Sequence, residues 1–286
     1  MRFGVKAALG DAREMAGLDV ELLEVHLGTE DLPRRSRAVV DLFRSIRIEH
    51  GHDLVVHAPE FMMTGAGPML VDLSSEDPSI LSLSLSTLEA TLGMAREVEA
   101  FLVVTHPGGI TPEPEAPHVS GAMDRLIGSL AHLRDMALEG GVKLTVENMP
   151  WFYHHKPVAG GEPQRWESTL LVTPDDMGVL APHVDGMTLD VCHAYLHSPE
   201  GGMDAIQGFI EAHADRILHL HLSDALPPDH EGLQVGEGAV DFGYVMSALA
   251  GREVTAVPEI MGGHRGGGIS FRRALEILRS IEASAP

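Results

Sequence analysis

Eight short apolar segments, which begin roughly 36 residues apart on average, constrain the fold of this chain more than any other feature. They comprise residues 3–6, 20–26, 53–58, 101–106, 142–147, 187–190, 217–223 and 254–260. Apolar residues at helical spacing occupy several intervals, at residues 34–49, 79–99, 122–139 and 271–283. A shorter helix is expected to begin at Pro174, with Thr173 as its N-cap. Alternating strands and helices predict a closed parallel (β/α)8 barrel, with an open doubly wound sheet as the alternative.

The pattern continues along the whole chain, without a linker or a change of composition that would separate two domains. We therefore expect residues 1–286 to form a single TIM-barrel domain, and 44% hydrophobic residues suffice for a full core. No apolar run approaches the roughly 18 residues that a membrane span needs, and residues 1–10 lack the apolar core of a signal peptide. The single cysteine, Cys192, excludes an intrachain disulfide. These features predict a cytoplasmic protein without a membrane partner.

Acidic residues outnumber basic ones by 42 to 20, which gives a formal net charge of −22. Non-specific binding of nucleic acid depends mainly on neutralising phosphates with Lys and Arg, so this balance argues against a broad nucleic-acid surface. An acidic surface poor in lysine also suits adaptation to a salty cytoplasm, in which case the charge carries no information about the ligand.

Six successive apolar segments end in a residue that can bind a metal ion. These residues are His57, His106, Glu147, Asp190, His221 and Glu259. The carboxyl ends of barrel strands converge on one axis, so we expect these side chains to share a pocket that His193 also reaches. Carboxylates packed so closely would repel one another unless cations neutralised them, and imidazole with carboxylate suits zinc, manganese or cobalt. The pattern predicts one to three divalent ions.

Each of these residues also has a structural interpretation when taken alone. A lone His57 or His106 is more often part of a core or a loop than a ligand, and Asp190 suits a helix N-cap. His219 shares the side-chain parity of His221 but lies one layer deeper, so we interpret it as a hydrogen-bonded interior residue. The joint pattern outweighs these interpretations, because core packing rarely places ligand-type residues at six consecutive strand ends.

Three long connections follow strand ends on the face where barrel enzymes place their active sites. They comprise residues 60–78, 149–167 and 225–238. The second contains Trp151 and three further aromatic residues, which either stack on a sugar or pack the loop down. A glycine-rich segment at residues 262–268 leads into the last predicted helix, and its backbone amides together with Arg265 either bind a phosphate or form a turn.

The sequence is similar to the xylose isomerase-like barrels. This superfamily contains sugar and sugar-phosphate isomerases and epimerases, as well as the endonuclease IV family of abasic-site nucleases. The motifs that carry the resemblance are Val56-His57-Ala58-Pro59, His106-Pro107-Gly108-Gly109, Val146-Glu147-Asn148, Leu189-Asp190-Val191-Cys192-His193, His221-Leu222-Ser223-Asp224, Gly236-Glu237-Gly238 and Pro258-Glu259. Together they are specific for the superfamily, and they cover essentially the whole chain from His57 onward.

The resemblance implies that Glu147, Asp190, His221 and Glu259 hold the single metal ion of the isomerases and epimerases. In that mechanism Glu147 and Glu259 exchange the proton on the carbon next to a metal-polarised carbonyl, and His193 orients a substrate oxygen. The implied activity is a metal-dependent isomerase or epimerase of a sugar or sugar phosphate, in a barrel type that often forms homo-oligomers. Further substrate contacts are expected from Trp151, Asp229, His230 and Arg265.

The same resemblance leaves a second function open, a zinc phosphodiesterase like endonuclease IV that cleaves abasic-site DNA. His57, His106 and His193 match additional zinc ligands of that nuclease. Other positions depart from its pattern: Glu60 stands where the nuclease has a tyrosine, and its Asp-x-His pair becomes the adjacent Asp229 and His230. A carboxylate at position 60 would repel a phosphodiester. A third possibility is a metal-containing barrel that binds a ligand or partner without catalysis.

Overall fold

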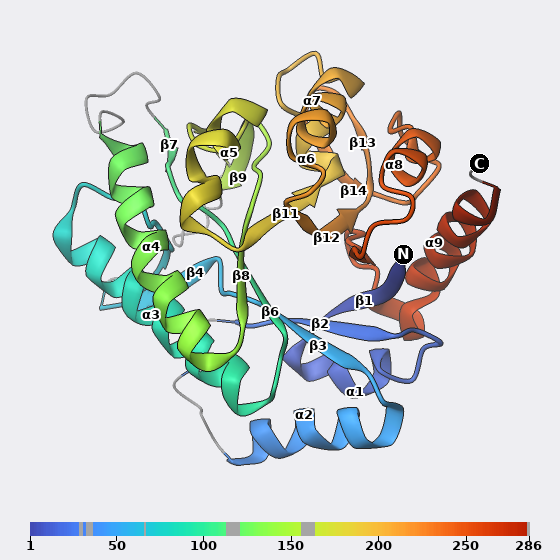
Figure 1. Ribbon diagram of the computed structural model, residues 1–286, viewed down its shortest axis with the longest axis horizontal. Coiled ribbons are helices and arrows are strands. Elements are labelled where there is room, and N and C mark those ends of the chain that lie inside the picture. Colours follow the sequence, from blue (N-terminus) through green and yellow to red (C-terminus); the bar gives the residue numbers. More distant parts are fainter. Residues whose placement is uncertain (29–30, 33–36, 66, 113–120, 156–163, 285–286) are drawn as a thin grey trace.

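Eight parallel strands close into one barrel in the computed structural model of the protein, which describes residues 1–28, 31–32, 37–65, 67–112, 121–155 and 164–284 (Figure 1). The strands are β1 (Arg2–Ala8), β2 (Leu22–His26), β3 (Asp53–His57), β6 (Leu102–Thr105), β8 (Lys143–Glu147), β11 (Gly186–Asp190), β12 (Ile217–Leu222) and β15 (Thr255–Pro258). They are neighbours in chain order, and β15 pairs with β1 to complete the barrel. The predicted (β/α)8 barrel is confirmed, and each predicted apolar segment coincides with one barrel strand.

Helices surround the barrel (Figure 1). They are α1 (Ala12–Met15), α2 (Arg37–His50), α3 (Pro78–Glu97), α4 (Ala122–Gly140), α5 (Pro174–Leu180), α6 (Val191–Tyr195), α7 (Met203–His213), α8 (Phe242–Ala248) and α9 (Arg265–Ser284), with short 3-10 turns at η1 (Leu9–Asp11) and η3 (Ala181–His183). The four predicted long helices are present as α2, α3, α4 and α9, although residues 34–36 of the first prediction lie outside the described part. The α5 helix begins at Pro174 as predicted, but the side chain of Thr173 makes no capping hydrogen bond.

Side-chain alternation along the strands separates an outer apolar layer from the barrel interior. In β12, Leu220 and Leu222 belong to the main core, whereas His219 and His221 make polar contacts inside the barrel. A small second cluster fills part of the interior with Leu22, Val55, Leu102, Val104 and Val257. Polar side chains near the strand ends occupy the remaining interior, which concentrates the chemically reactive residues at the carboxyl end of the barrel.

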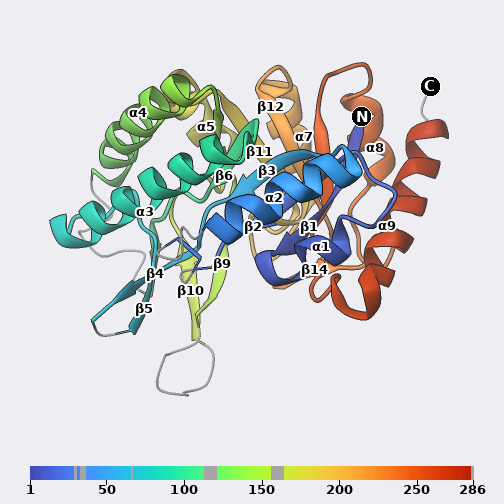
Figure 2. The ribbon, with the colours of Figure 1, turned by 90° about the horizontal axis from the view of Figure 1, so that it is seen from below.

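The three long connections predicted on this face fold into hairpins. In these hairpins β4 (Phe61–Thr64) pairs with β5 (Gly67–Leu70), β9 (Phe152–His155) with β10 (Gln164–Ser168), and β13 (Asp224–Leu226) with β14 (His230–Leu233). A short strand, β7 (Ile110–Thr111), adds to the free edge of β10. Figure 2 shows the β4–β5 and β9–β10 hairpins projecting from the same end of the barrel.

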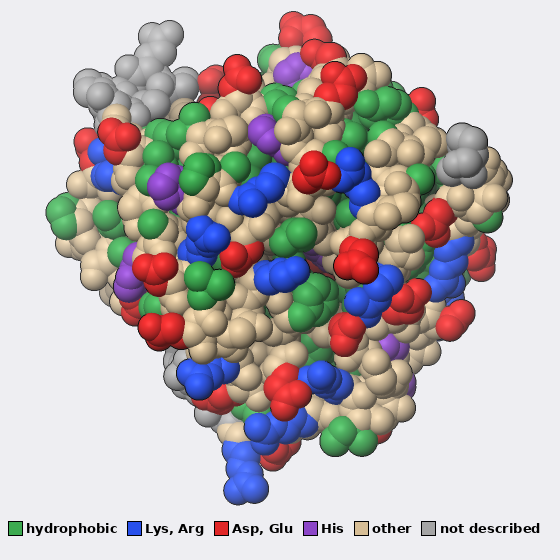
Figure 3. Space-filling view, viewed as in Figure 1, with side chains coloured by type: hydrophobic (Ala, Val, Ile, Leu, Met, Phe, Trp, Pro, Cys, Tyr) green, Lys and Arg blue, Asp and Glu red, His purple; other side chains and the backbone are tan. Residues whose placement is uncertain are grey.

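Acidic and basic side chains are interspersed on the face of the molecule drawn in Figure 3. Several arginines pair with neighbouring carboxylates, for example Arg2 with Glu21 at 3.2 Å and Arg273 with Glu237 at 2.9 Å. Such exposed pairs contribute little to stability individually. Within the described residues, no helix is long and apolar enough to cross a membrane.

The side chain of Asp224 connects the β13–β14 hairpin to residues 236–240, which follow the hairpin, by hydrogen bonds. One of its carboxylate oxygens accepts hydrogen bonds from the amides of Ala225 at 3.0 Å and Val240 at 2.9 Å, and the other accepts one from Gly236 at 2.9 Å. A Cβ at Gly238 would lie 2.4 Å from this carboxylate and 2.5 Å from the carbonyl oxygen of Ala225. The Gly-Glu-Gly motif therefore lets the chain close around a buried acid.

Replacing this acid, as Asp224→Ala, is expected to lower the free energy of unfolding by about 2–4 kcal/mol, because buried amides lose their acceptor. Asp241→Ala serves as the matched control: Asp241 accepts a hydrogen bond from the amide of Tyr244 at 3.0 Å, and losing such a helix cap costs about 1 kcal/mol. Urea denaturation followed by circular dichroism measures both values. Equal stabilities of the two variants would contradict the structural role assigned to Asp224.

Candidate metal centre

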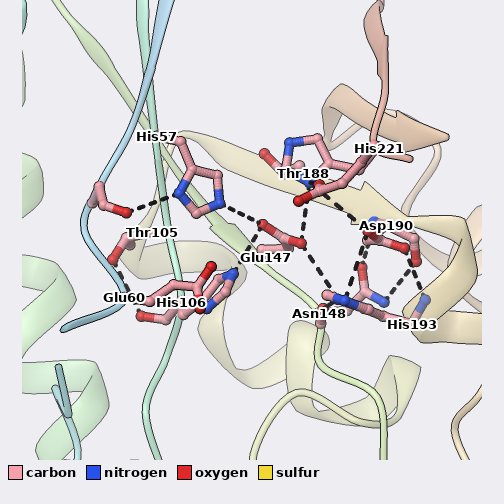
Figure 4. Close-up of polar contacts among 12 residues, drawn as sticks. His57, Glu60, Thr105, His106, Glu147, Asn148, Thr188, Asp190, His193 and His221 are labelled. Atoms are coloured by element: carbon pink, nitrogen blue, oxygen red, sulfur yellow. Dashed lines mark hydrogen bonds and ion pairs between the residues drawn. The ribbon is translucent and has the colours of Figure 1, made fainter. Parts of the chain in front are cut away.

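Four of the predicted metal ligands meet at the carboxyl end of the barrel. Glu147 ends β8, Asp190 ends β11, His221 is the penultimate residue of β12, and Glu259 follows β15. One ligand atom of each lies within 4.8 Å of the others. Nδ1 of His221 is 2.6 Å from Oε2 of Glu259, 3.1 Å from Oε1 of Glu147 and 3.9 Å from Oδ2 of Asp190. Figure 4 shows the side chains of Glu147, Asp190 and His221 turned toward one another.

Hydrogen bonds beneath this group orient the ring of His221. Glu24 on β2 accepts hydrogen bonds from Nε2 of His221 at 3.1 Å and from Nε2 of His219 at 2.7 Å. A proton on Nε2 of His221 leaves Nδ1 as the atom that can bind a cation. Oε2 of Glu259 is buried, and it faces Nδ1 of His221 at 2.6 Å without a hydrogen bond of regular geometry from the residues that the structure describes. A divalent cation would satisfy both atoms, so this donor set fits a bound metal.

The charges of the group favour a cation between the carboxylates. Burial alone would lower the pKa of His221, but Glu147, Glu24 and Glu259 raise it well above its usual range. Burial and the negative charges of Glu147 and Glu259 raise the pKa of Asp190 to about 6, although neighbouring histidines oppose this shift. The carboxylates therefore still repel one another when His221 is protonated. A metal ion that takes the place of the proton on Nδ1 would relieve this repulsion more fully.

Two histidines face the second oxygen of Glu147. Nε2 of His57 lies 3.3 Å and Nε2 of His106 lies 3.4 Å from Oε2 of Glu147. Nδ1 of His57 is 2.8 Å from the carbonyl oxygen of Ala58, which accepts its proton and leaves Nε2 as the ligand atom. The structure thus brings all six predicted strand-end residues together. Glu147 belongs to two groups whose ligand atoms lie close enough to hold a cation, one with His57 and His221 and the other with Asp190, His221 and Glu259.

Lys6 is a member of this centre that sequence analysis missed. Its Nζ lies 2.5 Å from Oε1 of Glu259 and 3.5 Å from Oε1 of Glu24. Burial would lower the pKa of Lys6, but these two carboxylates raise it. The only signal in the sequence was the presence of Lys6 and Glu24 within otherwise apolar strands, where a charged side chain needs a buried partner.

A Glu24→Gln variant is expected to bind a divalent metal about 10–100-fold more weakly, because outer carboxylates orient and strengthen histidine ligands. Calorimetric titration of the metal-free protein measures this affinity. Thr255→Val is the matched control, because Thr255 contacts Nδ1 of His219 at 2.7 Å. This substitution removes a neighbouring hydrogen bond but leaves the contact between Glu24 and His221 intact. Unchanged affinity in Glu24→Gln would show that Glu24 does not orient His221.

A cavity of about 730 Å³ adjoins the centre and is lined by Asp190, Glu259 and His193, among others. Nδ1 of His193 lies 2.9 Å from the carbonyl oxygen of Asn148, and its Nε2 lies 3.8 Å from Asp190 and 4.0 Å from Glu231. Burial opposes protonation, but Asp190 raises the pKa of His193 to about 9. Asp190 also accepts a hydrogen bond from the amide of His193 at 2.8 Å, so one carboxylate both caps α6 and faces the centre.

Glu60 and Tyr153 close one side of the cavity. The hydroxyl of Tyr153 donates a hydrogen bond to Glu60 at 2.9 Å, and Nε2 of His26 lies 3.8 Å from the same carboxylate. Burial opposes ionisation of Glu60, but His106, His26 and His57 lower its pKa to about 2. Tyr153 is one of the aromatic residues of the connection at residues 149–167. Its hydrogen bond to Glu60 connects the β9–β10 hairpin to the segment after β3.

Four residues that were expected to bind substrate are not among those that line the cavity. They are Trp151, Asp229, His230 and Arg265. Nε1 of Trp151 donates a hydrogen bond to the carbonyl oxygen of Pro228 at 2.8 Å. Arg165 lies 5.3 Å from the centre of the Trp151 ring and forms an ion pair with Asp229. His230 and Arg265 are exposed. Trp151 and Asp229 thus connect two hairpins, and Asp229 also lies 3.9 Å from Nε2 of His154, which lines the cavity.

A family model described as a xylose isomerase-like TIM barrel matches residues 12–281, and the chain belongs to this family. The uncharacterized protein MJ1311 of Methanocaldococcus jannaschii is 26% identical over 209 residues, which make up 71% of this chain and 62% of that relative. The chain thus spans less than two thirds of this curated relative.

Solved structures with the same fold include both an epimerase-like protein and a nuclease. A D-tagatose 3-epimerase-like protein is 23% identical with a TM-score of 0.71, and the match covers 98% of this chain and 99% of that one. Endonuclease IV from Thermus thermophilus is 19% identical with a TM-score of 0.68, and the match covers 100% of both chains. At these identities the likeness shows the fold, and the choice between the two activities depends on the site.

Proposed function

We propose that the protein is a divalent-metal-dependent isomerase or epimerase that acts on a sugar or sugar phosphate. The observation that carries the proposal is the convergence of Glu147, Asp190 and Glu259 on Nδ1 of His221 beside a cavity that suits a small ligand. These four side chains would hold the ion. When bound, the ion would supply Lewis acidity to neighbouring carbonyl and hydroxyl oxygens of the sugar.

Proton transfer is assigned to the two glutamates of this set. Glu147 comes from β8 and Glu259 from the end of β15, so they reach the centre from strands on either side of β11 and β12. Two carboxylates so arranged can remove the proton next to a carbonyl and return one to the same or the neighbouring carbon. His193, whose raised pKa keeps it protonated, would donate a hydrogen bond from Nε2 to a substrate oxygen.

Elemental analysis followed by a deuterium-exchange assay tests this proposal. We expect at least one zinc, manganese or cobalt ion per chain. In deuterated water we expect deuterium at the carbon next to the carbonyl of the substrate sugar, and no incorporation after chelation. A metal-loaded protein that exchanges no proton in any ketose or aldose of a broad panel, phosphorylated or not, would overturn the assignment.

His57 and His106 favour one alternative, a metal-dependent phosphodiesterase similar to endonuclease IV. They would add two nitrogen ligands beside Oε2 of Glu147, as a second metal ion would require. Glu60 in the cavity and the pairing of Asp229 with Arg165 argue against it. Incubation with an abasic-site duplex distinguishes the two functions: strand cleavage that a chelator abolishes, without exchange in any sugar, would assign the protein to the nucleases.

A further inference from the structure

Two carboxylates line the cavity outside the proposed ligand set, and the proposed chemistry does not use them. Glu60 reaches the cavity from the segment before β4, and Glu231 reaches it from β14. Their side chains are 26% and 29% exposed. Glu60 accepts a hydrogen bond from Tyr153, whereas Glu231 lies 4.0 Å from Nε2 of His193. Acidic groups therefore border the cavity on the hairpin side as well as at the metal centre.

The lysine that lines the cavity already has acidic partners. Among the described residues that line it, Lys6 is the one Lys or Arg, and its ammonium lies between Glu259 and Glu24. Lys6 and one divalent ion together balance the charge of the three carboxylates of the proposed ligand set. Glu24, Glu60 and Glu231 add three further negative charges, and His193, whose Nε2 lies 4.0 Å from Glu231, offsets one of them when it is protonated. The described lining of the cavity has no Lys or Arg besides Lys6 to offer an anionic group of a substrate.

Gly262 and His264 of the glycine-rich segment line the cavity, and the last three glycines of the segment form a turn, which was one of the two roles suggested by the sequence. Gly266, Gly267 and Gly268 have left-handed φ angles of 60°, 70° and 73°, so regular helix begins only after them. A Cβ at Gly267 would lie 3.5 Å from a carboxylate oxygen of Glu14, and one at Gly268 would lie 3.1 Å from Met15. This turn packs against α1 beside an acid, where a phosphate would be repelled.

We propose that the cavity selects a neutral, unphosphorylated polyhydroxy sugar, and that Glu60 and Glu231 set this preference. The inference rests on the proposed isomerase or epimerase function and narrows its substrate class. Carboxylate oxygens accept hydrogen bonds from sugar hydroxyls, as Glu60 already does from the hydroxyl of Tyr153. A phosphate dianion presents negative charge and acceptor oxygens to the same carboxylates, and partial burial limits screening of that repulsion.

Calorimetric titration of the metal-loaded protein tests this preference with matched pairs of probes, D-fructose against D-fructose 6-phosphate and D-tagatose against D-tagatose 6-phosphate, at constant ionic strength. We expect the neutral sugar to bind at least about 10-fold more tightly than its phosphate. In a Glu60→Gln/Glu231→Gln double variant this ratio should fall below about threefold, because the amides keep the shape and remove the charge. Glu211→Gln, an exposed substitution on α7, is the charge control and should leave the ratio unchanged.

Equal or tighter binding of the phosphates by the wild-type protein would overturn the inference, as would failure of both neutral sugars to bind. An unchanged ratio in the double variant would overturn the roles of Glu60 and Glu231. Deuterium exchange separates these results from the proposed function. Exchange confined to phosphorylated sugars would keep the proposed reaction and overturn the neutral-substrate inference. Selective binding of neutral sugars without exchange in any sugar would support the inference and overturn the reaction.

Discussion

Replacing Glu147 or Glu259 with glutamine is expected to lower turnover of the sugar by about 10²–10⁴-fold or more. Each glutamine keeps the size of the side chain, but it cannot take up the transferred proton and it removes one negative charge beside His221. Glu147 is 1% exposed and also contacts His57, His106 and His193, whereas Glu259 is 32% exposed and lines the cavity. We therefore expect Glu147→Gln to lose more metal than Glu259→Gln.

Turnover and metal content are measured on the same samples, so that loss of the ion is distinguished from loss of the proton-transferring group. Glu237→Gln is the matched control, because Glu237 is exposed and pairs with Arg273 on the surface. It should retain full turnover and full metal content. A near-normal rate in Glu147→Gln or in Glu259→Gln would rule out proton exchange by this pair.

Loading the metal-free protein with its divalent ion is expected to raise the free energy of unfolding by about 4 kcal/mol at a free metal concentration 1,000-fold above Kd. The ion binds the folded chain, where it offsets repulsion among Glu147, Asp190 and Glu259, and the unfolded chain has no preformed site. For a chain of this size the corresponding rise in Tm is on the order of 10 °C. Differential scanning calorimetry with and without chelator measures it.

Two histidine variants identify the source of this stabilisation. His221→Asn removes the nitrogen on which the carboxylates converge, so it should abolish the rise in Tm. His57→Asn leaves the four-residue set intact and should keep most of it. A Tm that responds equally to metal in wild type and His221→Asn would place the ion elsewhere. Loss of one of two bound ions in His57→Asn would establish a second position at Oε2 of Glu147.

The barrel could be predicted because its signals are local. Each strand is a short apolar run, each long helix has its own periodic apolar face, and eight such units in one chain have few alternative arrangements. The ligand set followed from the same reasoning. Parallel strands of a barrel converge at one end, so residues such as Glu147 and His221, 74 positions apart, had to lie close once their strands were recognised.

The surroundings of the ligand set could not be predicted in this way. Lys6 and Glu259 are 253 positions apart, and they meet because β1 pairs with β15 when the barrel closes. Trp151 and Asp229 were expected to contact a sugar from their residue types alone, and the structure adds contacts between hairpins: Trp151 donates a hydrogen bond to Pro228, and Asp229 pairs with Arg165. Side-chain partners of this kind depend on the relative placement of whole elements, which local periodicity does not encode.

The sequence by itself therefore determined the eight-stranded barrel and the six strand-end residues of the centre, because hydrophobic periodicity and barrel convergence need no knowledge of side-chain contacts. Only the tertiary structure decided how those residues are used. Barrel closure places Glu24 under His221 and thereby turns Nδ1 toward the carboxylates. Hairpin docking brings Glu60 and Glu231 to the cavity, where they add two carboxylates to its lining.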